Sequence, residues 1–142
     1  IKLLNYKESS GDSLYRRSMY TFIRRTNPPP SMSTFDAPTR QICVAKRAVT
    51  NTPQQALIGM NEPAMHAAAV DLGKRLGKYK DDIAKVRFAY LICFSRIPDQ
   101  QELEHCLQFI GKQRQQRAVG EGDEWTALAA VLLNLDEGLS RE

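Results

Sequence analysis

The order of hydrophobic and polar residues predicts a series of short helices in the last two thirds of the chain. Apolar side chains recur three and four positions apart over residues 56–60, 65–76, 83–94, 103–110 and 125–135, a spacing that gathers them on one helix face. Each segment carries too few large apolar side chains to offset the cost of ordering an isolated helix. We therefore expect an all-α fold, a compact bundle of four to five helices.

Helix start signals support this division. Thr52, Pro53 and Gln55 form a capping-box pattern with proline at the first helical position, and Asp99 with Glu102 repeats the N-cap and N3 pattern. Pro63 is expected to end one helix and start the next, because it cannot donate a backbone hydrogen bond. In the 83–94 helix Leu91, Ile92 and Phe94 widen the main stripe, so we expect this helix to be central and covered on more than one side.

Residues 1–51 lack this periodicity and are predicted to form an irregular basic segment docked on the bundle of residues 52–142. The regular elements that we expect in it are a short helix over residues 14–25 and a strand or an extended edge over residues 41–45. Three consecutive prolines, 28–30, exclude a helix interior and favour polyproline II. This proline-rich stretch is either a rigid connector that docks Met32 and Phe35 on the bundle or the lip of a pocket.

Charge is concentrated in the same segment. The whole chain has 20 Lys and Arg against 16 Asp and Glu, a net charge of +4, whereas residues 1–50 hold nine basic and three acidic side chains, a net charge of +6. Guanidinium groups match the paired oxygens of sulfate, phosphate and carboxylate. The arginines either form a solvated face with ion pairs to the acidic remainder or bind an anion, and the Lys46–Arg47 pair could join them. The candidate anion-binding residues are Arg16, Arg17, Arg24, Arg25 and Arg40.

No motif in the sequence specifies an active site. There is neither a glycine-rich phosphate loop nor a GxSxG nucleophile elbow, and His66 and His105 have no partners at ligand spacing. We therefore predict no metal site and no cofactor in this chain. Asp36 is the one candidate acid, base or ligand, although a single carboxylate is weak support for acid–base catalysis. Its position before Ala37 and Pro38 also fits a helix N-cap.

The cysteines and the hydropathy exclude further classes. Cys43, Cys93 and Cys106 are odd in number and have no CxxC spacing, which argues against a disulfide framework, a zinc site and covalent haem attachment. Cys93 and Cys106 lie on apolar faces and are predicted to be buried thiols, with a Cys93–Cys106 bridge as the alternative. No run approaches the roughly 18 apolar residues of a membrane span.

Three stretches together resemble a known family: LYRRSMYTFIRRTNPPPSMSTFDAPTRQICVAKRAVTNTPQQALIGMNEP, FSRIPDQQELE with its R-x-P-x-x-x-E-L pattern, and WTALAAVLLNLDEGLSRE. They are similar to the planctomycete cytochrome-associated domain, a domain of unknown function, from about residue 14 to residue 142. The resemblance implies the C-terminal part of a longer exported protein, in the periplasm or at the cell surface. Fuller members carry an upstream companion domain and sometimes a c-type haem domain. Because this chain has no CxxCH, any haem would belong to that other domain.

These observations favour a non-catalytic helical module of a larger exported protein. Its basic N-terminal block is expected to contact an anionic partner: an acidic polysaccharide, an acidic protein or the surface of a haem domain. The alternative is a fragment of an enzyme that acts on polysaccharide together with a c-type cytochrome domain, with Asp36 in a pocket. Nucleic-acid binding is a third hypothesis, disfavoured by the modest net charge and excluded by export.

Overall fold

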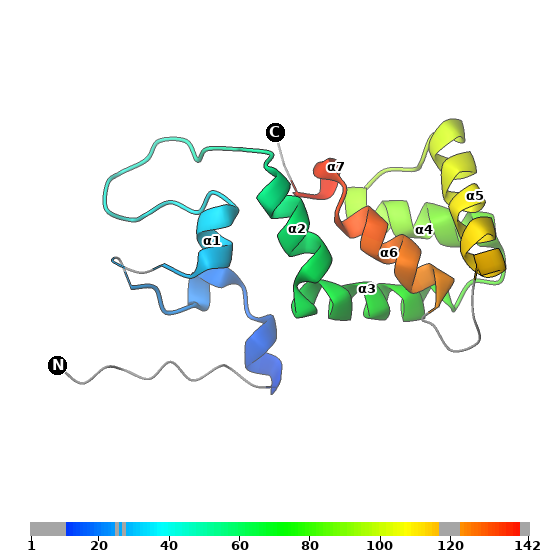
Figure 1. Ribbon diagram of the computed structural model, residues 1–142, viewed down its shortest axis with the longest axis horizontal. Coiled ribbons are helices and arrows are strands. Elements are labelled where there is room, and N and C mark those ends of the chain that lie inside the picture. Colours follow the sequence, from blue (N-terminus) through cyan, green and yellow to red (C-terminus); the bar gives the residue numbers. More distant parts are fainter. Residues whose placement is uncertain (1–10, 25, 27, 117–122, 140–142) are drawn as a thin grey trace. The chain divides into compact units, whose positions relative to one another are not determined.

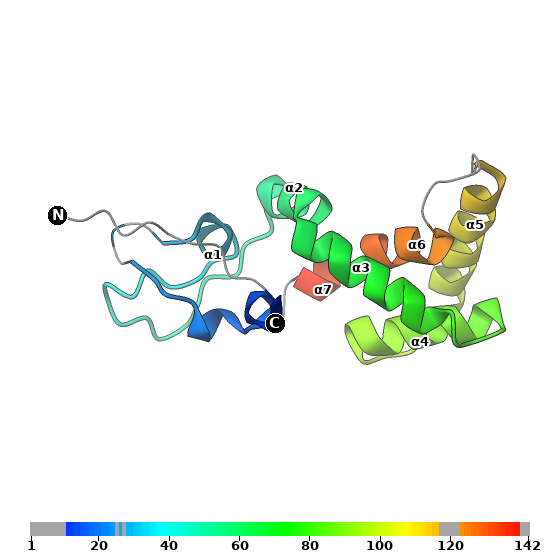
Figure 2. The same ribbon diagram turned by 90° about the horizontal axis from the view of Figure 1, so that it is seen from below.

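The chain consists of two compact units, each with its own set of elements. A computed structural model describes residues 11–24, 26, 28–116 and 123–139, and the contacts divide the chain into residues 1–48 and residues 49–142 (Figures 1 and 2). We call residues 1–48 the first unit and residues 49–142 the helical unit. Each is described by itself, and the docking of residues 1–51 on the bundle stays a prediction.

The helical unit confirms the predicted all-α fold. No β-strand occurs among the described residues of the chain. The helices of this unit are α2 (Pro53–Asn61), α3 (Pro63–Leu76), α4 (Asp82–Phe94), α5 (Gln100–Gln116) and α6 (Glu124–Leu133), followed by the single turn α7 (Asp136–Leu139).

Local side-chain hydrogen bonds explain where these helices begin. The Thr52 hydroxyl accepts from the Gln55 backbone N–H at 3.4 Å, and the Gln55 side chain accepts from the Thr52 N–H at 3.1 Å. Asp99 and Glu102 exchange the same pair of bonds at 2.7 and 2.8 Å. Each reciprocal pair satisfies two amides that the first helical turn leaves without partners. Both capping predictions, and the break at Pro63, are confirmed.

The core of the helical unit is built around α6. This helix contacts α3, α4 and α5, and its pairing with α3 is the most extensive (Figure 1). Gly73 permits the close approach, because a Cβ atom there would lie 2.8 Å from Thr126 Oγ1 and 3.0 Å from the Thr126 backbone nitrogen. Burying the apolar faces against each other is what stabilises helices that are individually short. The buried hydrophobic residues are Ala69, Leu72, Leu76, Val86, Ala89, Tyr90, Leu103, Cys106, Ile110, Trp125, Leu128, Ala129 and Leu132.

Helix α4 corrects one prediction. Val86, Ala89 and Tyr90 are buried as expected, but Leu91 and Ile92 are 53% and 43% exposed. Phe94 packs against the core, so the expected wider cover is wrong for Leu91 and Ile92, whose face of α4 stays exposed. The apolar residues of α4 exceed what the neighbouring helices α3, α5 and α6 cover, and a periodic pattern does not distinguish a covered apolar residue from an exposed one.

The first unit is irregular, as predicted, but its predicted elements are wrong. Residues 14–24 do not form one helix: the chain makes two 3₁₀ turns, Gly11–Tyr15 and Ser18–Tyr20, and residue 25 of the predicted helix lies outside the described residues. Residues 41–45 form no strand, and the short helix α1 (Pro30–Thr34) was not expected. Exposed apolar side chains such as Tyr15, Met19 and Phe22 explain why no long helix forms, since a helix of this length needs a packed face.

The three cysteines are free thiols. Cys106 is buried and Cys93 is partly buried, whereas Cys43 is exposed. Burial raises the pKa of the Cys93 and Cys106 thiols. Cys93 and Cys106 therefore behave as inert apolar side chains of the core and form no bridge to each other. In addition, no helix among the described residues is long and apolar enough to cross a membrane.

Candidate functional site

Helix α1 and the turn after it form the framework of a cavity in the first unit. Pro30 occupies the first turn of α1, where its missing N–H costs nothing. The helix ends in a Schellman motif, in which the Asp36 N–H donates to Ser33 O at 3.3 Å and the Ala37 N–H donates to Met32 O at 2.8 Å. Asp36 adopts φ of 55°, the left-handed backbone that this motif requires. The proline-rich stretch thus forms a short helix that ends in a hydrogen-bonded turn.

Arg47 fastens this turn from eleven residues further along the chain. Its Nε donates to Asp36 O at 2.9 Å, and its Nη2 donates to Phe35 O. Both carbonyls follow the last turn of α1, where acceptors lack helical partners. The two bonds fix the guanidinium of Arg47 beside the turn, so its position is set by the fold of the first unit.

The cavity beside Arg47 has a volume of about 280 Å³. Apolar side chains supply much of its lining, small hydroxyl residues supply part of the remainder, and two arginines bring positive charge. Arg40 reaches this position with φ of 60°, a left-handed backbone that is uncommon for a residue other than glycine. The lining residues are Ser18, Met19, Ile23, Pro28, Met32, Ser33, Ala37, Pro38, Thr39, Arg40 and Arg47.

The predicted anion-binding residues are only partly brought together here. Arg40 lines the cavity, while Arg16 and Arg17 are exposed just before Ser18 and Arg24 follows the lining residue Ile23. Arg25 lies outside the described residues. From the sequence, Arg47 was only a possible addition to the anion-binding arginines. Its hydrogen bond to the Asp36 carbonyl could not be predicted, because the two residues are eleven positions apart along the chain.

Asp36 is placed next to the cavity but does not line it. Its prediction as a helix N-cap is wrong, because α1 ends before it and no helix begins at Pro38. The physical reason is that Met32 and Ser33 accept hydrogen bonds from the turn, so this residue closes a helix instead of opening one. A catalytic role of Asp36 stays a prediction that nothing here tests.

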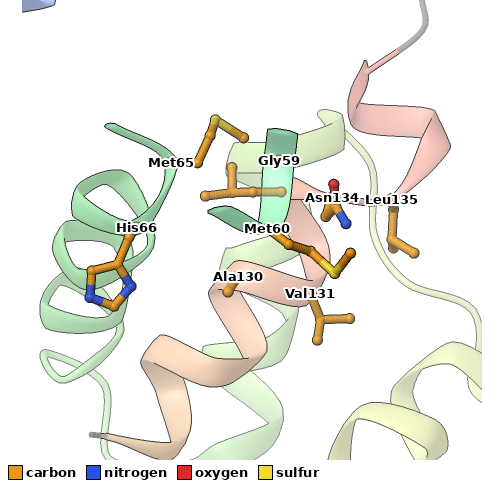
Figure 3. Close-up of a pocket in the computed structure, with 9 residues that line it drawn as sticks. Gly59, Met60, Met65, His66, Ala130, Val131, Asn134 and Leu135 are labelled. Atoms are coloured by element: carbon orange, nitrogen blue, oxygen red, sulfur yellow. The ribbon is translucent and has the colours of Figure 1, made fainter. Parts of the chain in front are cut away.

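A second cavity, of about 330 Å³, lies in the helical unit between α2, α3 and α6. Figure 3 shows Met60 extending toward Val131 and Leu135, with His66 on α3 at the other side. Gly59 leaves room for the Asn134 side chain, whose Oδ1 is buried without a hydrogen-bond partner among the described residues. The lining contains no acidic residue, lysine or arginine, and its polar side chains are His66 and Asn134.

Three arginines of the helical unit are engaged with carboxylates. Arg75 pairs with Asp71 at 2.8 Å. Arg114 joins Asp82 at 2.8 Å and Glu124 at 3.2 Å, which ties the ends of α4, α5 and α6 together. These guanidinium groups are therefore already matched with acceptors within the fold.

Arg96 makes the most extensive of these pairings. It donates to Glu102 at 2.6 Å and, across 41 residues of sequence, to Glu137 at 2.7 Å, so it links the start of α5 to α7. The Arg96 guanidinium lowers the pKa of the Glu102 carboxyl from 4.5 to about 2, and it also lowers the pKa of Glu137. Arg96 and Glu102 are the arginine and the glutamate of the R-x-P-x-x-x-E-L pattern. We call Arg96, Glu102 and Glu137 the Arg96 clamp, because their ion pairs join the α4–α5 connection to α7.

The clamp predicts how stability depends on pH. Because the folded pKa of Glu102 is lowered, its contribution is complete above the unfolded pKa near 4.5 and is lost as pH falls toward about 2. Glu102→Gln keeps a capping oxygen but removes the charge, so we expect about 1 kcal/mol less stability at pH 7 and a shallower loss between pH 5 and 3. Urea unfolding followed by Trp125 fluorescence measures both, since Trp125 is the single tryptophan.

Glu104→Gln on the exposed face of the same helix is the matched control, and its pH profile should follow the wild type. Superimposable pH profiles for Glu102→Gln and the wild type would contradict the clamp.

Among the described residues, no group of three or more His, Cys, Asp and Glu side chains is placed to hold a metal ion.

Comparison with known families gives a match to a family model described as PSD1, protein of unknown function (DUF1553), over residues 2–110. That range is more than three quarters of the 142 residues. The chain belongs to the PSD1 family. Searches of curated proteins and of solved structures found no match.

The PSD1 match covers the cavity of the first unit and most of the helical unit. It includes the cavity of the first unit with Arg40 and Arg47, and it extends through α2, α3 and α4 into α5. The predicted membership in a family of unknown function is confirmed at this level. Association with planctomycetes and with cytochromes stays a prediction from the resemblance.

Proposed function

We propose that this PSD1 chain is a non-catalytic module whose first unit binds an anionic partner. The observation that supports the proposal is the cavity beside α1, whose lining includes both Arg40 and Arg47, the latter held by the Asp36 carbonyl. In the helical unit, by contrast, Arg75, Arg96 and Arg114 are paired with carboxylates. The proposal therefore places the anionic partner at Arg40 and Arg47 of the first unit.

The charge balance of the first unit supports the same proposal. Its described residues include six basic side chains and two acidic ones, Asp12 and Asp36, a net charge of +4. A surface with one predominant sign attracts a partner of opposite charge, and the attraction weakens as salt screens it. The basic residues are Arg16, Arg17, Arg24, Arg40, Lys46 and Arg47.

The proposal also gives the module a setting. We place it in a larger exported protein, in the periplasm or at the cell surface of a planctomycete, beside a c-type haem domain or another companion domain. The support is the resemblance of residues 14–63, 94–104 and 125–142. In this setting an acidic polysaccharide, an acidic protein or the companion's surface would be the anionic partner.

A binding titration tests the proposal. The full chain is titrated with heparin and with polygalacturonate at 50 and 300 mM NaCl, by isothermal calorimetry. We expect measurable affinity that falls with salt and a further loss of about tenfold for Arg40→Ala, because a charge-assisted hydrogen bond contributes about 1.5–3 kcal/mol.

Arg87→Ala is the matched control, since Arg87 is an exposed arginine of α4 and the substitution removes the same charge. An affinity that is the same at both salt concentrations, or an equal loss of affinity in Arg87→Ala and Arg40→Ala, would remove the support for a site on the first unit.

A further inference from the structure

The cavity of the first unit combines charge with an apolar lining. Met19, Ile23 and Met32 contribute apolar side chains, and Pro28 and Pro38 contribute rigid rings. A surface that only follows a sulfated or uronate polymer needs spaced cations and no apolar recess. The recess beside Arg40 therefore calls for a ligand whose charged group is attached to something apolar.

The backbone around this recess is held in uncommon conformations. Arg40 lines the recess with φ of 60°, a conformation that is unfavourable for a residue other than glycine, whereas the φ of 55° at Asp36 belongs to the Schellman motif that ends α1. Unfavourable conformations persist where the surrounding structure imposes them, and they gather at ligand-binding sites. The Arg47 guanidinium is held by two backbone carbonyls, so little of its freedom remains to be lost on binding.

We infer that this cavity binds a carboxylate carried on an aliphatic or aromatic body. The inference rests on the proposed function and names the ligand class of the same site. The carboxylate would face Arg40 and Arg47, and the apolar body would lie on Met19, Ile23 and Met32. A volume of about 280 Å³ is close to the lower end of small-molecule sites, about 300–1,000 Å³, so the body is small.

Two sources share this chemistry: a free carboxylic acid, and the C-terminal carboxylate of a protein chain that ends in an apolar residue. The test uses the full chain and nuclear magnetic resonance titrations with acetate, butanoate, hexanoate and 1-hexanol. Affinity is expected to rise about fourfold for each added CH₂ group, as expected for apolar burial. Hexanoate is expected to bind at least tenfold more tightly than 1-hexanol, which has a six-carbon alkyl group but no carboxylate.

Two substitutions separate the parts of the site. Arg40→Gln should weaken all the acids by about the same factor. Met32→Ser should flatten the dependence on chain length and leave acetate unchanged, whereas Met60→Ser, an exposed methionine of α2, should change nothing. If Met32→Ser does not fold, the titrations of the wild-type chain with acetate, butanoate and hexanoate still test whether affinity rises with the length of the acid.

The source is then decided with a pentapeptide ending in leucine, with a free or an amidated C-terminus. Tighter binding of the free form supports a protein C-terminus, and preference for hexanoate over both peptides supports a free acid. Affinity that does not change from acetate to hexanoate, together with salt-sensitive binding of heparin, overturns this inference and leaves the proposed function standing. No binding of acids or polymers overturns both.

Discussion

Leu128→Ala is expected to lower the free energy of unfolding of the helical unit by about 2–5 kcal/mol. Leu128 lies on α6 and is 1% exposed, at the point where this helix meets its neighbours. Its removal takes apolar atoms from the core and leaves a cavity that closely packed helices do not refill. The fluorescence of Trp125, which is also buried on α6, reports the transition in urea.

Val131→Ala on the same helix is the control, because Val131 is 44% exposed and its loss should cost less than about 1 kcal/mol. The pair separates burial from helix propensity, since both residues lie within α6. Similar losses for Leu128→Ala and Val131→Ala would mean that α6 does not occupy the core of the helical unit.

Gly73→Ala is expected to destabilise the helical unit where Gly111→Ala stabilises it. Both glycines lie inside helices, α3 and α5, so alanine gives each about 0.5–1 kcal/mol through helix propensity. At position 73 the new methyl group would meet Thr126 of α6 at 2.8–3.2 Å, including two backbone atoms. At position 111 nothing lies within 4 Å.

The difference between these two variants therefore isolates the contact of α3 with α6. We expect Gly73→Ala to be less stable than Gly111→Ala by about 1–3 kcal/mol, the usual cost of overpacking, in the same urea assay. Equal stabilisation in both variants would show that α3 and α6 are not in close contact at Thr126.

The helical unit could be predicted from the sequence because its signals are local. Thr52 and Gln55, or Asp99 and Glu102, lie three residues apart, and their capping bonds form within one turn. The Arg96 clamp could not be predicted in this way, since its partner Glu137 is 41 residues away. The exposure of Leu91 on α4 was missed because apolar periodicity marks a face without showing whether another element covers it.

The first unit was harder to predict for a related reason. Pro38 after Asp36 resembled the start of a helix, whereas the turn is stabilised by the end of α1 and by Arg47 eleven residues later. The candidate site was predicted only as a set of arginines. The structure places Arg40 and Arg47 in one lining, which no spacing in the sequence indicated.

The central claim of this account is that an anionic partner meets the first unit and leaves the helical unit untouched. A titration of the ¹⁵N-labelled full chain with polygalacturonate, followed by amide chemical shifts at low and high salt, tests it directly. The account predicts salt-sensitive shifts within residues 11–48, largest around Arg40 and Arg47, and none within α3, α4 or α6. Chemical-shift changes confined to the helical unit, or no changes at all, would contradict it.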